Sequence, residues 1–215
     1  MNYSLKVIAA SLLLIGTTHF STKAQDSNPV RFGIKGGVNF SSLYAKNAED
    51  TKMRTGFNIG LFTKLPISNF VAIQPELYYT AKGAEVSYST TFVDGTAGFH
   101  FNYIELPLMF VGNITKTFNV HAGPYVAFLI NGKVKNESNV SLFDFEDNID
   151  TDDYNTFETG FAVGAGIDLR ALSFGIRYNH GFSTVGKERT YMQTSYTFPD
   201  AKNGVINLYM SLSFN

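Results

Sequence analysis

Cysteine and tryptophan are absent from this 215-residue chain, and charged residues make up only 16% of it. Without cysteine there can be no disulfide, no thiolate metal site, no cysteine nucleophile and no N-terminal lipidated cysteine. The formal net charge is −1, so no basic surface points to a nucleic-acid partner. No apolar run approaches the roughly 20 residues of a membrane-spanning helix. What the chain has in quantity is 19 Gly, 20 Phe and 12 Tyr.

The first 24 residues have the layout of a secretory signal peptide. Lys6 precedes an apolar or small run over Val7–Gly16, and small and polar residues follow up to Ala24. A positive start, an apolar middle and a small residue at the cleavage site are typical of export across the inner membrane. We therefore predict residues 1–24 as the signal peptide and residues 25–215 as one mature domain.

From Arg31 onward the apolar residues recur with a period of two, which indicates β-strands. Eight segments show this alternation: Arg31–Ser41, Arg54–Leu65, Phe70–Lys82, His100–Val111, Thr117–Asn131, Thr156–Arg170, Leu172–Phe182 and Asn203–Asn215. One face of each segment is uncharged. The opposite face carries the charges Lys35, Lys64, Glu76, Glu105, Glu158, Asp168 and Arg177, among mostly small residues.

Such alternation fits either a soluble lipocalin-like barrel, apolar inside, or a membrane barrel, apolar outside. Glycines such as Gly60, Gly160 and Gly175 occupy the charged face and suit a crowded interior. The segments are long, and short connections alternate with long ones, as in barrels with periplasmic turns and outer loops. A one-residue slip would turn seven charges toward lipid, at a cost on the order of 10–20 kcal/mol. We therefore predict an all-β fold: a single eight-stranded antiparallel up-and-down transmembrane β-barrel.

Three prolines fall within these segments, although a closed barrel has no free edge to tolerate a missing N–H. We expect Pro75, Pro107 and Pro124 to lie near a rim or at a β-bulge.

Several short motifs resemble the Bacteroidota-type outer-membrane β-barrel family, the porin-like group that includes PorT-like proteins. They begin with Phe32–Ser41 and Gly56–Gly60, continue with Tyr103–Leu108 and Gly123–Tyr125, and end with Gly164–Leu169 and Arg177–Asn179. The resemblance covers Gln25–Asn215 and implies an eight-stranded barrel in the outer membrane of a Gram-negative bacterium. It does not imply an enzymatic activity. One departure is that Asn215 follows Phe214, whereas such barrels usually end on an aromatic residue.

The inward charges are the first candidate site. We predict a lumen polar network of Lys35, Lys64, Glu76, Glu105, His121, Glu158, Asp168 and Arg177. Its role is either an interlocked set of ion pairs, which we favour because small barrels are filled, or the lining of a narrow channel.

Other candidates carry weaker signals. Six acidic residues within Asp144–Asp153 could hold Ca²⁺, but their spacing does not match an EF-hand, so we expect a solvated loop. His180 and Ser183 near the outer rim could form a lipid-hydrolase pair, although no orienting acid accompanies them. Aromatic girdles are expected at Phe40, Tyr44, Phe99, Phe101, Tyr178 and Phe182 on the outer side, and at Phe70, Phe118, Phe174 and Phe214 on the inner side.

The sequence thus favours a non-enzymatic protein without cofactor or metal, a plugged scaffold that presents surface loops. The alternatives are a narrow porin-like channel for ions or small solutes and an accessory component of a protein-secretion or motility system. The expected partners are outer-membrane lipids and lipopolysaccharide, the barrel-assembly machinery and a protein partner at the outer loops.

Overall fold

Eight long strands form the body of the molecule in a computed structural model that describes residues 29–45, 51–89, 94–138, 145–148, 154–186, 188–191, 194–197 and 201–214. The long strands are β1 (Arg31–Ala45), β2 (Thr51–Pro66), β3 (Val71–Ser89), β4 (Asp94–Asn113), β5 (Phe118–Ser138), β7 (Phe157–Leu169), β8 (Leu172–Thr184) and β11 (Ala201–Phe214). Three short strands accompany them: β6 (Phe145–Asn148), β9 (Glu188–Tyr191) and β10 (Thr194–Thr197).

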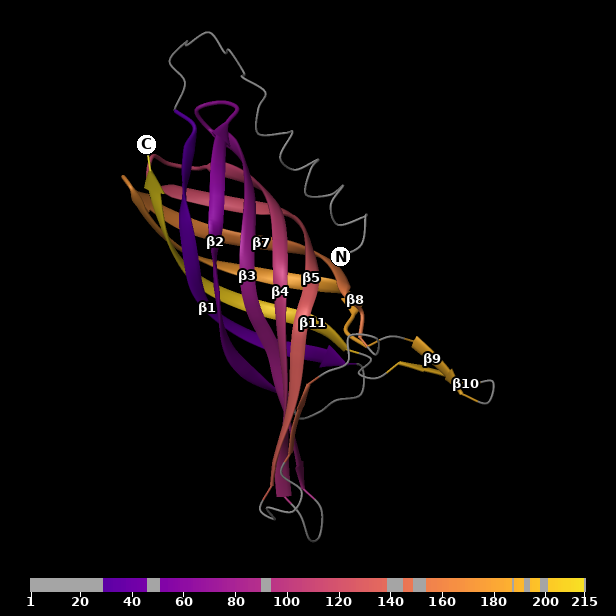
Figure 1. Cartoon of the computed structure of the whole chain (residues 1–215). Helices are drawn as coiled ribbons and strands as arrows, with labels where there is room; N and C mark the ends of the chain where they lie inside the picture. The colour runs from indigo at the N-terminus through magenta and orange to yellow at the C-terminus, as the bar shows by residue number, and fades with distance from the viewer. Residues whose placement is uncertain are drawn as a thin grey trace.

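The long strands close into an antiparallel barrel (Figure 1). Each pairs with its sequence neighbours among the eight, and β1 closes the circle by pairing with β11 from Phe32 opposite Phe214 to Ala45 opposite Ala201. Closure gives every barrel strand a partner on both sides, which removes the free edges that an open sheet exposes. The predicted fold class, a single eight-stranded up-and-down barrel, is confirmed.

The two rims of the barrel differ. At one, which we call the short-turn rim, four-residue turns follow Pro66 and Asn113, and a two-residue turn joins β7 to β8. Hydroxyls cap both longer turns: Ser68 Oγ accepts from the Val71 N–H at 3.2 Å, and Thr115 Oγ1 accepts from the Phe118 N–H at 2.9 Å. Arg170 opens the tight turn with a φ of 55°. The opposite rim, the long-loop rim, carries the longer connections.

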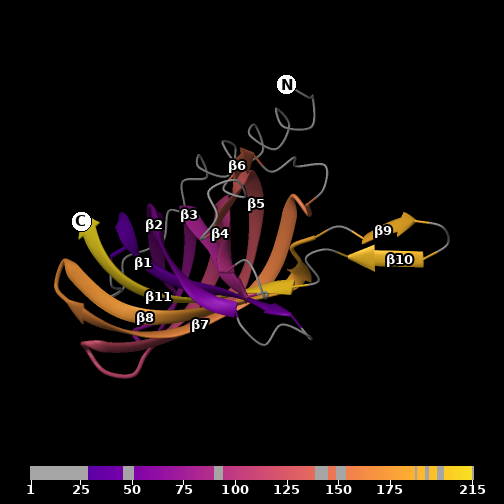
Figure 2. The same ribbon diagram turned by 90° about the horizontal axis from the view of Figure 1, so that it is seen from below.

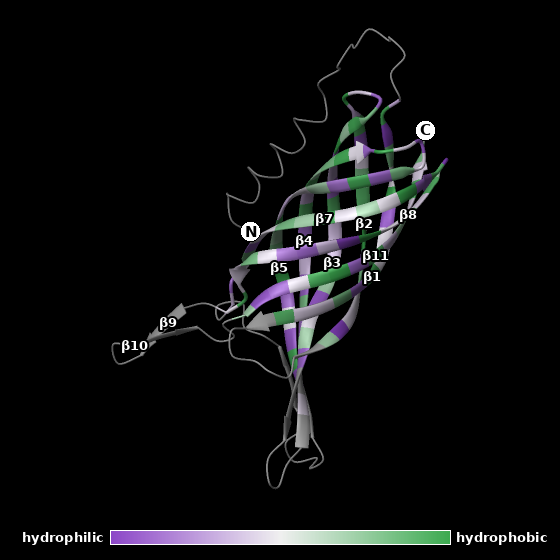
Figure 3. Cartoon of the chain, turned by 180° about the vertical axis from the view of Figure 1, so that it is seen from behind, coloured by the Kyte–Doolittle hydropathy of each residue, from purple (hydrophilic) through white to green (hydrophobic). Residues whose placement is uncertain are grey.

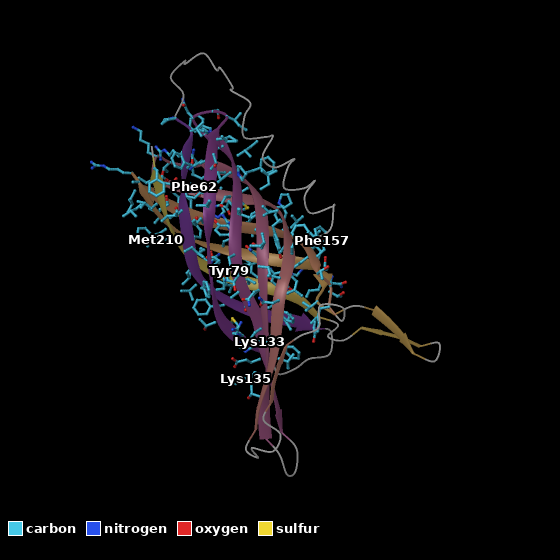
Figure 4. The ribbon with its side chains drawn as sticks, in the orientation of Figure 1. Phe62, Tyr79, Lys133, Lys135, Phe157 and Met210 are labelled. Carbon is cyan, nitrogen blue, oxygen red and sulfur yellow. The ribbon has the colours of Figure 1, made fainter. Side chains whose placement is uncertain are left out.

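Hydrophobic and hydrophilic residues alternate along the barrel strands (Figure 3), and their burial assigns them to opposite faces of the wall. Outward side chains are apolar and exposed, among them Ile59 at 60%, Phe174 at 43% and Met210 at 54%. Tyr79, Phe157 and Met210 lie on this outer surface (Figure 4). An outer wall built so continuously from apolar side chains requires an apolar surrounding, because exposing that much apolar surface to water is unfavourable. Within the described ranges, no helix is long and apolar enough to cross a membrane.

The strands continue further at the long-loop rim than the alternation predicts. The predicted segments leave residues 83–99 and 132–155 as connections, but β3 continues to Ser89, β4 begins at Asp94 and β5 continues to Ser138. With β6, which pairs with β5 at residues 133–136, they form an extension beyond the barrel, seen at the bottom of Figure 1. In this extension both faces of each strand meet water, so the sequence no longer alternates between apolar and polar residues, although the backbone pairing continues. A β9–β10 hairpin, also unpredicted, projects to one side (Figure 2).

The expectation for the prolines is wrong in part. Pro75 lies four residues into β3, but Pro107 and Pro124 lie well within paired strands. The register is the same on both sides of all three, and the described register shifts lie elsewhere, for example between Asn102 and Tyr103. The ladders are instead interrupted for two residues next to the prolines, so the missing N–H groups are accommodated without a bulge.

Candidate functional site

The barrel interior holds the polar side chains, and its first cluster centres on the carboxylate of Glu76. Lys35 Nζ donates to Glu76 Oε1 at 3.1 Å. Arg177, which lies on β8, donates from its guanidinium to both carboxylate oxygens of Glu76. Gln74 Nε2 adds a bond of 2.6 Å to the same carboxylate. The Lys35 ammonium lies 3.8 Å above the ring of Tyr209, a cation–π contact. The carboxylate of Glu76 on β3 thus pairs with both cations, and Arg177 reaches it from a strand on the other side of the barrel.

A second cluster surrounds Lys82. Its ammonium lies 3.2 Å from Glu105 Oε2 and 2.8 Å from Glu158 Oε1, and its side chain is 1% exposed. Tyr125 donates to Glu158 at 2.8 Å, and Asn179 donates to Glu105 at 2.9 Å. Lys82 was not in the predicted network because the alternation places it at the end of its segment, where an outer loop is expected. Its even numbering, shared with Glu76, is the signal that could have assigned it to the interior.

The remaining predicted residues lie nearer the short-turn rim. Lys64 Nζ pairs with Asp168 Oδ2 at 3.1 Å and reaches Asn113 at 3.4 Å, and both members of the pair are half-buried. His121 is buried, and its Nδ1 lies 3.1 Å from Asn119 Oδ1. All eight predicted residues therefore face the lumen, in three separate groups. With Lys82 added, the ion-paired residues that the structure describes in the interior are four basic and four acidic, so their charges balance.

The long-loop end of the lumen is closed by apolar packing. Phe101 and Tyr103 are 0% and 1% exposed, and they pack with Leu43, Leu129 and Val185 inside the barrel. The assignment of Phe101 to the outer aromatic girdle is therefore wrong, because its odd-numbered position on β4 faces inward with Tyr103. Phe182, at 56% exposed, does face outward, as do the four inner-rim phenylalanines.

Interior glycines make room for the aromatic residues of neighbouring strands. A Cβ on Gly60 would stand 2.6 Å from Tyr78 Cδ1, and one on Gly164 would stand 2.6 Å from His121 Nε2. Both distances are far below van der Waals contact, so the glycines set how tightly the interior packs.

We therefore expect Gly60→Ala to destabilise the barrel by about 1–3 kcal/mol, the usual cost of overpacking a filled core. Gly112→Ala is the matched control, since its nearest neighbour would be Val120 Cγ2 at 3.6 Å. Urea unfolding in lipid vesicles, followed by far-UV circular dichroism, measures the difference. Equal stability of the two variants would contradict the packing argument.

The weaker candidates gain no support. Ser183 Oγ lies 3.2 Å from Thr159 Oγ1, whereas His180 contacts the rings of Tyr178 and Phe182. The two residues of the candidate hydrolase pair are thus each engaged with other side chains. Among the described residues, no group of three or more His, Asp or Glu side chains is placed to hold a metal ion. The acidic loop Asp144–Asp153 is described only as strand β6, and its side chains lie outside the described residues.

A closed barrel with an apolar outer wall and a charged, filled interior is an integral membrane β-barrel of the outer-membrane class. The sequence profile of the family "Outer membrane protein beta-barrel domain" matches residues 23–185. The chain belongs to this family, and it is a protein of the outer membrane of a Gram-negative bacterium, where it sits among lipids and lipopolysaccharide. In such barrels the short turns lie in the periplasm and the longer loops outside the cell.

Two solved structures are similar in fold. The attachment invasion locus protein Ail of Yersinia pestis matches with a TM-score of 0.50 and 15% sequence identity, over 87% of this chain and 100% of that one. Neisserial surface protein A matches with a TM-score of 0.50 and 13% identity, over the same shares. At these identities the likeness concerns the fold alone. The chain matches no curated protein.

Proposed function

We propose that this protein is a non-enzymatic, plugged scaffold that presents its outer loops at the cell surface. The observation that carries the proposal is that side chains fill the lumen along its length. The Lys64–Asp168 pair lies at the periplasmic end, the Glu76 and Lys82 clusters follow, and the packing around Phe101 closes the outer end.

A conducting role fits this interior less well. Conduction needs a continuous path, and the space lined by Lys35, His121 and Tyr209 has a volume of only about 30 Å³. A cavity of about 10–15 Å³ on this measure holds one water molecule, so the space takes only a few waters. The lumen charges also neutralise one another, whereas a selectivity lining presents a ring of one sign. Ion pairs that cross the lumen instead join strands distant in sequence, as between Arg177 of β8 and Glu76 of β3.

The part of the molecule that projects from the outer rim supports a presentation role. The extension of β3, β4, β5 and β6 stands clear of the barrel, and Lys133 and Lys135 lie along it (Figure 4). A rigid paired sheet holds its tip in a defined position, so it suits contact with a protein partner better than a free loop.

The biogenesis that we propose rests on sequence motifs. The protein is a PorT-like member from the Bacteroidota, exported by the signal peptide 1–24 and folded by the barrel-assembly machinery. Phe214, the last outward aromatic residue of β11, supports recognition by that machinery, although Asn215 follows it.

Planar-bilayer recording tests the plugged scaffold. The purified mature protein is expected to give no stable ohmic current, and proteinase K added to whole cells is expected to cut within residues 139–153 and spare the turns after Pro66 and Asn113. A stable ohmic pore would instead establish the narrow porin. Loss of protein secretion in a deletion strain, restored when the intact gene is returned, would instead establish the accessory role.

A further inference from the structure

A cavity of about 610 Å³ opens at the short-turn rim, on the periplasmic side of the barrel. It lies between the β2–β3 and β4–β5 turns, which contribute Asn69 and Thr115, and beside the start of β1 at Arg31. Its volume falls within the range of small-molecule sites, and its lining mixes polar groups with apolar ones such as Phe70.

The charges around this cavity do not balance, unlike those of the lumen. Arg31, Lys64 and Lys116 line it, with Asp168 as the one acid in the lining. Lys64 is paired with Asp168 at 3.1 Å. Within the described residues, Arg31 and Lys116 have no carboxylate within 4 Å, which leaves two uncompensated cations at the mouth. The site is therefore complementary to an anion.

The cavity leads inward. The smaller space of about 30 Å³ shares Arg31, Lys64 and Asp168 with it and reaches Lys35 and His121. His121 is buried, and its Nε2 has no hydrogen-bond partner among the described residues. A buried ring nitrogen without a partner costs free energy unless a water or ligand satisfies it. The Lys64–Asp168 pair thus stands where the wide outer cavity meets the narrow inner one.

We propose that this cavity binds an anionic group, a phosphate or carboxylate, that arrives from the periplasm. Arg31 and Lys116 attract the anion, and Lys64 binds it with the one N–H donor that Asp168 and Asn113 leave free. Asp168 opposes binding, because its carboxylate competes for Lys64. The site goes beyond the scaffold role, and neither proposal depends on the other.

The test uses the mature protein in nanodiscs of zwitterionic lipid, titrated with inorganic phosphate and with glycerol 3-phosphate while backbone amide NMR shifts are recorded. We expect saturable shifts at Asn113 and Lys116. Lys64→Gln should weaken binding at least tenfold, and Asp168→Asn should tighten it several-fold. If the pair had a purely structural role, both variants would change the affinity for the anion in the same direction, and that result would overturn the proposal.

Lys202→Gln is the matched control, since it removes one exposed positive charge at the opposite rim and should leave the affinity unchanged. Weakening by Lys202→Gln equal to that by Lys64→Gln would reduce the effect to overall charge and overturn the site. If the same shifts appear only when phosphatidylglycerol replaces part of the zwitterionic lipid, the anion is a lipid headgroup, and the site stands with that source. No saturable shift in either arm would overturn it.

Discussion

Lys82→Met is expected to cost about 3–5 kcal/mol of the free energy of unfolding, because it leaves two buried carboxylates without their cation. Glu105 and Glu158 both bind the Lys82 ammonium, and all three side chains are buried inside the barrel. A loss of that size is a large part of the stability of an ordinary domain. Urea unfolding in lipid vesicles, followed by far-UV circular dichroism, measures it, since the chain has no tryptophan to report.

The control for this variant removes the carboxylate charges as well. The triple variant Lys82→Met, Glu105→Gln, Glu158→Gln should recover most of the lost stability, since the amide oxygens still accept from Asn179 and Tyr125. Lys116→Met removes an exposed lysine at the periplasmic rim and should be close to neutral. Equal stability of Lys82→Met and Lys116→Met would show that the Lys82 cluster does not hold the barrel together.

Ile59→Arg is expected to block assembly. Ile59 lies on the outer face of β2 and is 60% exposed to the surroundings of the barrel. Arginine at the bilayer midplane costs about 2–4 kcal/mol, and the cost falls toward the interfaces. The measurement is the fraction of heat-modifiable, folded protein recovered from outer membranes.

Two further variants separate lipid contact from other effects. Ile59→Ala removes the side chain without adding a charge and should assemble well. Ser138→Arg adds the same charge at the end of β5, beyond the barrel, and should also assemble. If all three variants folded to the same extent, the outer wall would not face hydrocarbon.

The alternation in the sequence was enough to predict the barrel because lipid and lumen impose opposite requirements on successive residues. Ile59 and Gly60 show this, since neighbours on β2 face hydrocarbon and the Tyr78 ring respectively. The same rule has no force beyond the membrane, where both faces of a strand meet water. The extension of β3, β4 and β5 and the β9–β10 hairpin could therefore not be predicted from the period alone.

The interior was harder to predict than the wall. The sequence shows which residues face inward but not which partners they meet, because Arg177 and Glu76 are separated by 101 positions. Lys82 was missed because its segment was ended too early. Its absence from the predicted set left four acids against three bases, and that imbalance in a sealed space was itself a sign that one cation remained to be found.

The extension also fixes a distance. On β5 the last outward apolar side chain is Ile130, and the strand continues to Ser138. At about 3.3 Å per residue, the tip stands roughly 20 Å or more above the hydrocarbon boundary. Sugars attached to neighbouring lipids crowd the first part of that height. A molecule too large to pass between those sugars can thus still touch this strand tip, while the barrel wall stays hidden beneath them.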